Sequence, residues 1–201
     1  MRSLGTVAEL WLFPVKSTAG IQVDAIDLDP AGVRGDRAWA VRDAGTGELL
    51  TAAREPRLRD VRPALDAGRL ILAVPGVDRP ADPRADAEEA LSTYLGRPVR
   101  LDRAEGGAFV DLAPVHLVSV RSMEAAARQH DAECACSVEP PRANVVLSLP
   151  DDQPGEADLV GERVCLGGAR LHVSRRPQHC LGVYANVVQP ARVAVGDPLT
   201  W

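Results

Sequence analysis

The stretch that organises this chain is LFPVKSTAG, at residues 12–20, followed by GVRGDRAW at residues 32–39. Both motifs place cationic or hydroxyl side chains beside a turn, which is the arrangement that holding an anion requires. Lys16 offers a point charge, and Arg37 offers a planar fork that matches phosphate oxygens. The residue types alone leave an alternative open, in which these cations are solvated and the Asp36–Arg37 pair only clamps a turn.

The composition is that of a globular chain without a strongly basic surface. Its 201 residues suffice for one large domain or two small ones. A hydrophobic content of 46% with only 3% aromatic residues predicts a core of Val, Leu, Ala and Ile. The formal net charge of −5 argues against a general nucleic-acid binder. No apolar run approaches the ~20 residues of a membrane span, and the N-terminus lacks a signal-peptide pattern, so we expect a cytoplasmic protein.

Short apolar segments separated by turn residues recur at roughly 8–12-residue intervals, a rhythm typical of β-barrels and sandwiches. The first strand is expected at residues 7–13. Helices interrupt the rhythm at residues 85–95, which Gly96 would end, and at residues 123–130, with Ser122 as the N-cap. The sequence therefore predicts a mainly β protein with a few helices (α+β). A boundary between two halves is expected near residues 103–107.

The four cysteines are treated as reduced thiols, because the chain carries no secretion signal. Cys134 and Cys136 form a Cys-x-Cys pair without a second pair at metal-site spacing, which favours two thiols in a loop over a zinc site. Cys165 lies between Val164 and Leu166, as a small core residue would. Cys180 follows two cations, Arg175 and Arg176, which would favour its thiolate form.

The two N-terminal motifs resemble the "YPVKS…G" and "G…GDR.W" signatures of the N-terminal β-barrel domain that accompanies MOSC (molybdenum cofactor sulfurase C-terminal) domains. Phe13 stands where Tyr is usual. The second half resembles the MOSC domain itself, in the segments DLAPVHLVS (residues 111–119), RANVV (142–146), LGVYA (181–185) and VGD (195–197). The resemblance implies an N-terminal small β-barrel domain, residues 1–104, packed on a MOSC β-barrel domain, residues 105–201, with a cofactor cleft between them.

The same resemblance implies that the protein binds a molybdenum cofactor of the molybdopterin type. Carried over position by position, the implied cofactor-binding residues are Lys16, Ser17, Arg37, Ser119, Arg142 and Asn144. Cations suit the cofactor's terminal phosphate, and an Asn side chain can pair with both donor and acceptor edges of a pterin ring. Ala143 replaces the Pro of the family's Arg-Pro-Asn motif, but both polar residues are kept.

Cys180 is implied as the catalytic residue and the metal ligand, because a soft thiolate suits a redox-active metal. The family usually places this cysteine in a Pro-x-Arg-Cys loop, with a variable stretch before the next strand. Here residues 176–180 run straight into that strand, and His179 stands where Arg is expected. Either the intervening stretch is deleted and Cys180 is the ligand, or the ligand loop itself is lost.

The implied function is reduction of N-oxygenated small-molecule substrates, with electrons from a separate redox protein. No iron–sulfur cysteine set or flavin fingerprint is present to supply them internally. One alternative is a sulfur-carrier or cofactor-handling protein in which Cys180 holds a persulfide. Another is a non-catalytic descendant of the fold that binds a different anion. His116 and His172 are expected to be structural histidines.

Overall fold

The structure is a computed structural model that describes residues 2–77, 84–105, 108–110, 113–133, 142–178 and 180–201. The chain divides into two compact units, which are described separately. The first unit combines Met1–Leu12, Gln22–Arg34 and Asp111–Trp201. The second combines Phe13–Ile21 and Gly35–Val110. Neither unit is one continuous stretch of sequence, since the chain passes from the first to the second unit and back twice.

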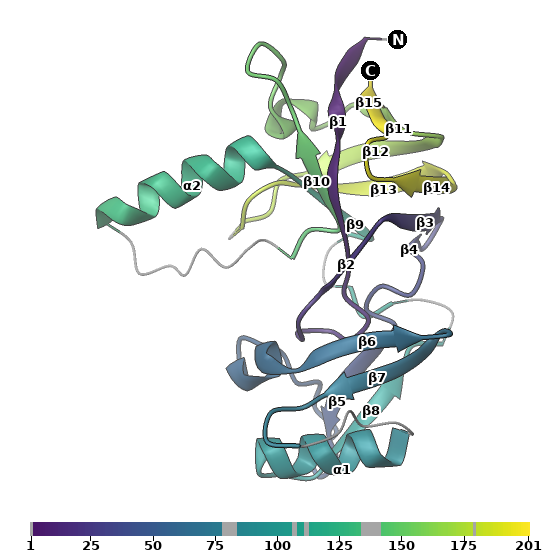
Figure 1. Ribbon diagram of the computed structural model, residues 1–201, viewed down its shortest axis with the longest axis vertical. Coiled ribbons are helices and arrows are strands. Elements are labelled where there is room, and N and C mark those ends of the chain that lie inside the picture. The colour runs from purple at the N-terminus through teal and green to yellow at the C-terminus, as the bar shows by residue number, and fades with distance from the viewer. Residues whose placement is uncertain (1, 78–83, 106–107, 111–112, 134–141, 179) are drawn as a thin grey trace. The chain divides into compact units, whose positions relative to one another are not determined.

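Seven strands of the first unit close into a barrel (Figure 1). Around the ring the order is β10, β9, β13, β12, β11, β15 and β1, and β1 pairs back with β10. Only β9 and β10 run parallel in this ring. The ring strands are β1 (Ser3–Leu12), β9 (Val115–Ser119), β10 (Val145–Ser148), β11 (Arg163–Leu166), β12 (Ala169–Arg175), β13 (Val183–Gln189) and β15 (Pro198–Thr200).

β1 starts four residues earlier than the sequence pattern predicts. Its inward side chains include Leu4, Val7 and Leu10, a spacing of three that strict strand alternation does not give. Register shifts explain the spacing, because the pairing of β1 with β10 is irregular between Val7 and Glu9. The bulge lets one long strand keep its apolar side chains in the barrel interior while it pairs with β10 and β15.

The rest of the first unit is small. β3 lies between β14 and β4 in a three-stranded sheet, and β2 extends the barrel sheet beside β1. A 3₁₀ helix and one α-helix complete the unit. Their bounds are β2 (Ile21–Val23), β3 (Ala25–Asp29), β4 (Gly32–Val33), β14 (Ala191–Ala194), α2 (Val120–Glu133) and η2 (Glu156–Leu159).

The predicted N-cap of α2 is wrong. The helix begins directly after β9, and its N-cap is Ser119, whose Oγ accepts a hydrogen bond from the backbone N–H of Ser122 at 3.0 Å. This is the bond between an N-cap side chain and the third helical residue. The sequence pattern did not show that β9 passes into α2 without a loop.

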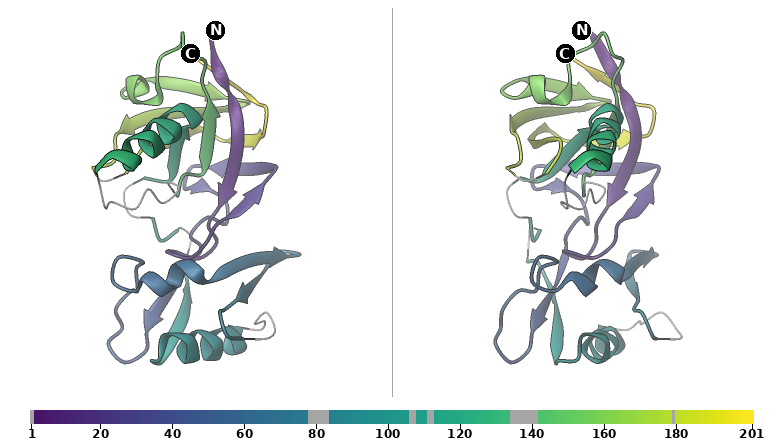
Figure 2. Two further views of the ribbon diagram at one scale, coloured as in Figure 1. Left: turned by 60° about the vertical axis from the view of Figure 1, so that its left-hand side comes forward. Right: turned by 90° about the vertical axis from the view of Figure 1, so that its left-hand side faces the viewer.

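The second unit packs two antiparallel strand pairs and a helix around its own core. β5 pairs with β8, β6 pairs with β7, and α1 lies beside β8 (Figure 2). α1 contributes Ala87 and Leu91 to the core. α1 ends as predicted at Gly96, which has a φ of +68°. The elements are β5 (Trp39–Asp43), η1 (Pro56–Asp60), β6 (Arg62–Asp66), β7 (Arg69–Ala73), α1 (Arg84–Leu95) and β8 (Val99–Arg103).

The mainly β fold predicted from the sequence is confirmed, with fifteen strands and two α-helices in the described residues. The division into domains 1–104 and 105–201 stays a prediction. The compact units cut the chain differently, because β1 to β4 lie with the strands of the C-terminal half. The last crossing between units, at residues 110 and 111, comes a few residues after the expected boundary.

Candidate functional site

The LFPVKSTAG motif forms a turn that backbone hydrogen bonds fasten to the start of β5. Val15 and Trp39 make an isolated parallel bridge. The N–H of Lys16 donates to the carbonyl of Trp39 at 2.7 Å, and the N–H of Trp39 donates to the carbonyl of Pro14 at 3.0 Å. The parts of the two motifs that belong to the second unit, residues 13–20 and 35–39, are therefore adjacent, although they lie about twenty residues apart in the sequence.

Lys16 is a cation held almost entirely out of water, with 5% of its surface exposed. Its Nζ donates a hydrogen bond to the carbonyl oxygen of Phe109 at 3.0 Å. A charge in such surroundings interacts more strongly with a nearby anion than a solvated charge does, because the local dielectric is lower. The burial contradicts the alternative in which Lys16 is a solvated surface cation.

Two residues of these motifs have left-handed backbone conformations that non-glycine residues seldom adopt. Ser17 has a φ of +70° and Arg37 has a φ of +47°. Each such residue costs roughly 1–2 kcal/mol, which the surrounding structure must offset. Only one other described non-glycine residue, Ala67, has a positive φ. Two of the three strained positions thus belong to the predicted anion site.

The Arg37 side chain is fixed on two sides. Its Nη1 donates to Oδ2 of Asp36, and its guanidinium lies over the Phe13 ring, 5.1 Å from the ring centroid. The side chain is 14% exposed, so it is the more accessible of the two motif cations. Lys16, Ser17 and Arg37 therefore lie in one unit, and anion binding by these residues stays a prediction.

Ser119, by contrast, has its polar groups engaged within the fold. It is fully buried, and its Oγ caps α2 and bonds to the Ser122 hydroxyl at 3.0 Å. Its N–H donates to Oε1 of Glu156 at 3.2 Å. Burial alone would raise the pKa of Glu156, but the hydrogen bonds from Ser119 and Ser122 outweigh burial and lower it. The hydrogen bonds from Ser119 and Ser122 therefore stabilise the buried Glu156 carboxylate within the fold.

Asn144 is also fully buried, and it joins three strands of the barrel. Its Oδ1 accepts from the N–H of His116 at 3.3 Å, and its Nδ2 donates to the carbonyl of Trp11 at 3.4 Å. Its own N–H donates to the His116 carbonyl, and its carbonyl accepts from the Trp11 N–H, both at 2.9 Å. The side chain therefore completes the closure of the barrel where β10 enters between β1 and β9.

The remaining predicted residues of the first unit lie near the starts of strands. Arg142 precedes β10 and is partly buried. Cys180 precedes β13 and is exposed, with its Sγ 4.0 Å from the Tyr184 hydroxyl. Cys165, on β11, is only partly buried, so it is less enclosed than its predicted core position suggests. His179, Cys134 and Cys136 lie outside the described residues.

The Cys180 thiol lies near Tyr184, a residue of β13 that packs against β9. The Tyr184 ring packs against the His116 ring, with centroids 4.8 Å apart. His116 Nε2 is 2.7 Å from the carbonyl oxygen of Leu181, which fits the predicted structural role of this histidine. Gly182, with a φ of +90°, passes so close to β9 that an added Cβ would lie 2.2 Å from the Leu117 carbonyl oxygen.

Two neighbours of the predicted anion site were missed from the sequence. Asp36 was treated only as a turn clamp, yet it is 2% exposed and bonds to both motifs. Its position inside the GDR motif was a usable signal. Phe109, 93 residues from Lys16, carried no signal, because nothing in the local pattern marks a carbonyl that bonds to a distant lysine.

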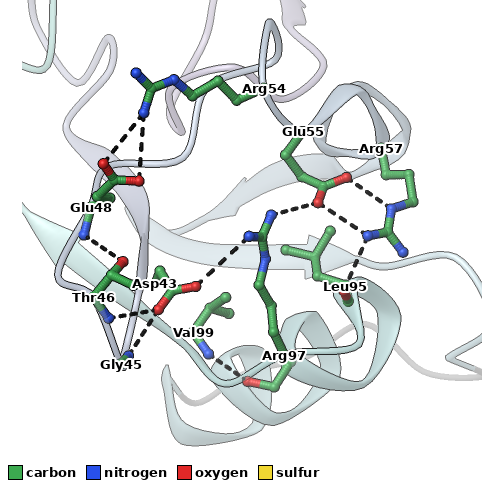
Figure 3. Close-up of polar contacts among 11 residues, drawn as sticks. Asp43, Gly45, Thr46, Glu48, Arg54, Glu55, Arg57, Leu95, Arg97 and Val99 are labelled. Carbon is green, nitrogen blue, oxygen red and sulfur yellow. Dashed lines mark hydrogen bonds and ion pairs between the residues drawn. The ribbon is translucent and has the colours of Figure 1, made fainter.

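A second cluster of charges in the second unit was considered as an anion site (Figure 3). Glu55 is 6% exposed and accepts from Arg57 Nε at 2.8 Å and from Arg97 Nη2 at 2.6 Å. Arg57 also donates to the last carbonyls of α1, those of Tyr94 and Leu95, both at 3.1 Å. These cations are already paired with a carboxylate and a helix terminus, so the cluster fastens α1 to η1.

The described part of the chain holds no group of three or more His, Cys, Asp or Glu side chains placed to bind a metal ion. Neither α1 nor α2, as far as each is described, is long and apolar enough to cross a membrane.

Residues 4–98 match the model of the MOSC N-terminal beta barrel domain. Mitochondrial amidoxime reducing component 2 of Bos taurus is 37% identical over 83 residues, which cover 39% of this chain and 24% of that protein. Molybdenum cofactor sulfurase of Danio rerio is 31% identical over 127 residues, which cover 49% of this chain and 15% of that protein. The chain thus spans about a quarter or less of the length of these relatives.

Among solved structures, the crystal structure of the YUAD protein from Bacillus subtilis resembles this chain with a TM-score of 0.50. The match covers 99% of this chain and 96% of that one at 16% sequence identity. At that identity the likeness concerns the fold, and it extends over both compact units. The comparisons therefore agree with the resemblance drawn from the two N-terminal motifs.

Proposed function

We propose that this chain, whose residues 4–98 match the model of the MOSC N-terminal beta barrel domain, binds a molybdenum cofactor of the molybdopterin type. The observation that carries the proposal is the locked turn of the second unit. There a buried Lys16 lies beside two left-handed residues, Ser17 and Arg37, within the stretch that the domain model matches. A fold does not maintain such strain and such a buried charge without compensation, and anion binding is a function that both features serve.

The second unit fits the phosphate end of the cofactor. Lys16 supplies a charge of low hydration, and Arg37 supplies a fork of N–H donors on a side chain that stays partly accessible. The Ser17 hydroxyl adds a donor at the same turn. The role of these three residues is to bind and orient the anionic end.

The predicted cofactor-binding residues of the first unit differ in how well their side chains could contact the cofactor. Arg142 is a partly buried cation, suited to the pterin or to a second anionic group. Ser119 and Asn144 have their side chains engaged in a helix cap and in barrel closure. We therefore propose that Ser119 and Asn144 mainly hold the backbone in place, Asn144 at the strand ends beside Arg142 and Ser119 at the β9–α2 junction. Direct contact with the cofactor would be their lesser role.

Cys180 is the proposed metal ligand. Its thiol is exposed and precedes β13, where the contacts of Tyr184 and Gly182 hold the backbone against β9. Thiolate sulfur is the ligand type that soft metals favour. When bound, the cofactor would supply the two-electron redox chemistry, and the chain would orient it and present the thiolate.

The activity that follows is reduction of N-oxygenated small molecules, with electrons from a separate redox protein. Support comes from the similarity to amidoxime reducing components, which is confined to a part of this chain. A cytoplasmic location and the absence of a nucleic-acid partner belong to the same proposal.

The exposure of Cys180 also favours a second candidate, a sulfur carrier that holds a persulfide on this thiol. An exposed thiol is accessible to a donor or acceptor protein. The similarity to molybdenum cofactor sulfurase is compatible with this candidate as well. The two candidates differ in what the purified protein contains: molybdenum and pterin in the first, and cyanide-labile sulfur without metal in the second.

The test compares Cys180→Ala with Cys165→Ala in protein purified from a host that makes the cofactor. Cys165 is the matched control, because it is the other described free cysteine and lies on β11. We expect Cys180→Ala to lose molybdenum while Cys165→Ala retains it. Equal molybdenum content in both variants would contradict the thiolate ligand. Loss of cyanide-labile sulfur in Cys180→Ala, from metal-free wild type, would favour the carrier.

A further inference from the structure

Ser17 is held in its left-handed conformation by a tight turn. The backbone N–H of Thr18 donates to the Val15 carbonyl at 3.3 Å, and the Thr18 hydroxyl donates to the same carbonyl at 2.9 Å. These bonds close a turn of residues 15–18 in which Ser17, with a φ of +70°, is the third residue. Glycine is the usual residue at a turn position of positive φ, because it has no Cβ to strain the backbone.

Elsewhere the second unit uses glycine in left-handed turns. Gly35 has a φ of +81° and Gly47 has a φ of +74°. Gly35 belongs to the other motif of the predicted anion site, so both kinds of residue occur within that site. A serine in this backbone conformation lowers the stability of the fold relative to glycine. The cost calls for a role of the Ser17 side chain that glycine could not fill.

The fold itself gives the Ser17 side chain no such role. Ser17 is 8% exposed, and within the described part of the chain no hydrogen bond is made by its hydroxyl or by its backbone N–H. Polar groups that are so enclosed normally have a hydrogen-bond partner. The next residue shows the contrast, because the Thr18 hydroxyl is bonded to the turn that it closes. Ser17 therefore has two donors suited to a bound ligand.

The neighbouring charge favours an anionic ligand at these donors. Lys16 precedes Ser17 and is 5% exposed. Its charge attracts an anion through a medium of low dielectric, whichever groups its ammonium is bonded to. The oxygens of an ionised phosphate only accept hydrogen bonds, so they need donors such as a hydroxyl and a backbone N–H.

We propose that Ser17 combines a stability cost with a binding role: its strained backbone is tolerated because its hydroxyl donates to a phosphate monoester. The inference rests on the proposed function, in that the phosphate is that of the cofactor. Glycine at this position should make the fold more stable and the site weaker. These opposite effects distinguish Ser17 from a residue that only shapes the turn, for which stability and binding would change together.

The experiment measures phosphate affinity and thermal stability on the cofactor-free full chain. Inorganic phosphate is titrated by calorimetry and by ³¹P line broadening into wild type, Ser17→Ala and Ser17→Gly. Both variants should bind phosphate about tenfold more weakly, because each loses a hydrogen bond to a charged group. Only Ser17→Gly should raise the Tm, by about 2 °C, because it alone relieves the backbone strain. Ser17→Ala keeps the strain and should unfold near the wild-type Tm.

Ala67→Gly is the matched control. Ala67 is an exposed residue of the same unit, in the turn between β6 and β7, and has a φ of +46°. The substitution should raise the Tm as Ser17→Gly does, because it relieves the same kind of strain. It should leave phosphate affinity at the wild-type value, which would show that relief of strain does not by itself weaken binding.

Four results would overturn the proposal: wild-type phosphate affinity in Ser17→Ala, a Tm of Ser17→Gly at or below that of wild type, a loss of affinity in Ala67→Gly as large as in Ser17→Gly, or no phosphate binding by wild type. Pterin content separates this outcome from that of the proposed function. Phosphate binding that depends on the Ser17 hydroxyl, in a chain that never acquires pterin, would leave the role of Ser17 intact and remove the molybdenum cofactor.

Discussion

At the scale of single residues, the Lys16 turn shows how a cation comes to be buried. Its position in a motif could be seen from the sequence, but its burial could not. Burial depends on the Trp39 and Phe109 carbonyls, which accept from the backbone N–H and the Nζ of Lys16 respectively. Asn144 shows the opposite outcome, because a side chain predicted to contact a pterin has both polar atoms bonded to neighbouring strands.

Gly182 permits a residue-scale prediction. An added Cβ would meet the Leu117 carbonyl oxygen at 2.2 Å, whereas at Gly68, which also has a positive φ, nothing lies within 4 Å. Gly68→Ala should lower the free energy of unfolding by about 1 kcal/mol, from backbone strain alone. Gly182→Ala adds a backbone clash and should cost about 2 kcal/mol more. Urea unfolding of both variants measures the difference, and equal losses would contradict the close packing of this segment on β9.

At the scale of elements, the attachment of α1 depends on one buried carboxylate. Hydrogen bonds from Arg57 lower the pKa of Glu55 most, and those from Arg97 lower it further, against the opposing effect of burial. The folded-state pKa is therefore below the unfolded one, so the carboxylate's stabilisation is fully present above the unfolded value of about 4.3. It is lost as the pH falls from there through the folded pKa.

Glu55→Gln should therefore lower the free energy of unfolding by about 2 kcal/mol at neutral pH, because two arginines lose their charged partner. The difference from wild type should shrink as the pH falls below about 4. Glu48→Gln is the control, since Glu48 and Arg54 are both exposed and 3.5 Å apart, and such pairs contribute under about 1 kcal/mol (Figure 3). A pH-independent difference, or equal effects of the two substitutions, would contradict the role given to Glu55.

At the scale of the whole molecule, the barrel is closed by a strand from the opposite end of the chain. β1 lies between β15 and β10, and the bulge at Val7–Glu9 adapts its register to them. A fragment of residues 105–201 would leave unpaired edges on β10 and β15 and would expose the apolar interior that Leu4, Val7 and Leu10 fill. Folding of the C-terminal half should therefore depend on the first strand.

We expect the fragment 105–201 to lack cooperative thermal unfolding and to give poorly dispersed amide resonances. A fusion of residues 1–34 to 111–201 through a flexible linker restores β1 to β4, and it should unfold cooperatively. Native-like dispersion in the fragment alone would show that the sequence-based division at residue 104 is the autonomous one. Comparing the fragment with the fusion shows which of the two divisions of the chain gives a part that folds on its own.

The sequence predicts local features well and long-range pairing poorly. The helix ending at Gly96 follows from residue spacing and a glycine stop, and the turn motifs follow from residue type. The pairing of β1 with β10 depends on residues about 140 positions away, and no local pattern shows it. The same limit explains why Asp36 was recognised as a neighbour of Arg37 but not as a partner of Phe13.

The most direct test of the central claim is the molybdenum and pterin content of the wild-type chain, purified from a host that makes the cofactor. Molybdenum would be measured by elemental analysis, and pterin by the fluorescence of its oxidised form. The account predicts both at close to one per chain, with both lowered in Arg37→Ala, where the phosphate loses its fork of donors. Wild-type protein with neither molybdenum nor pterin would contradict it.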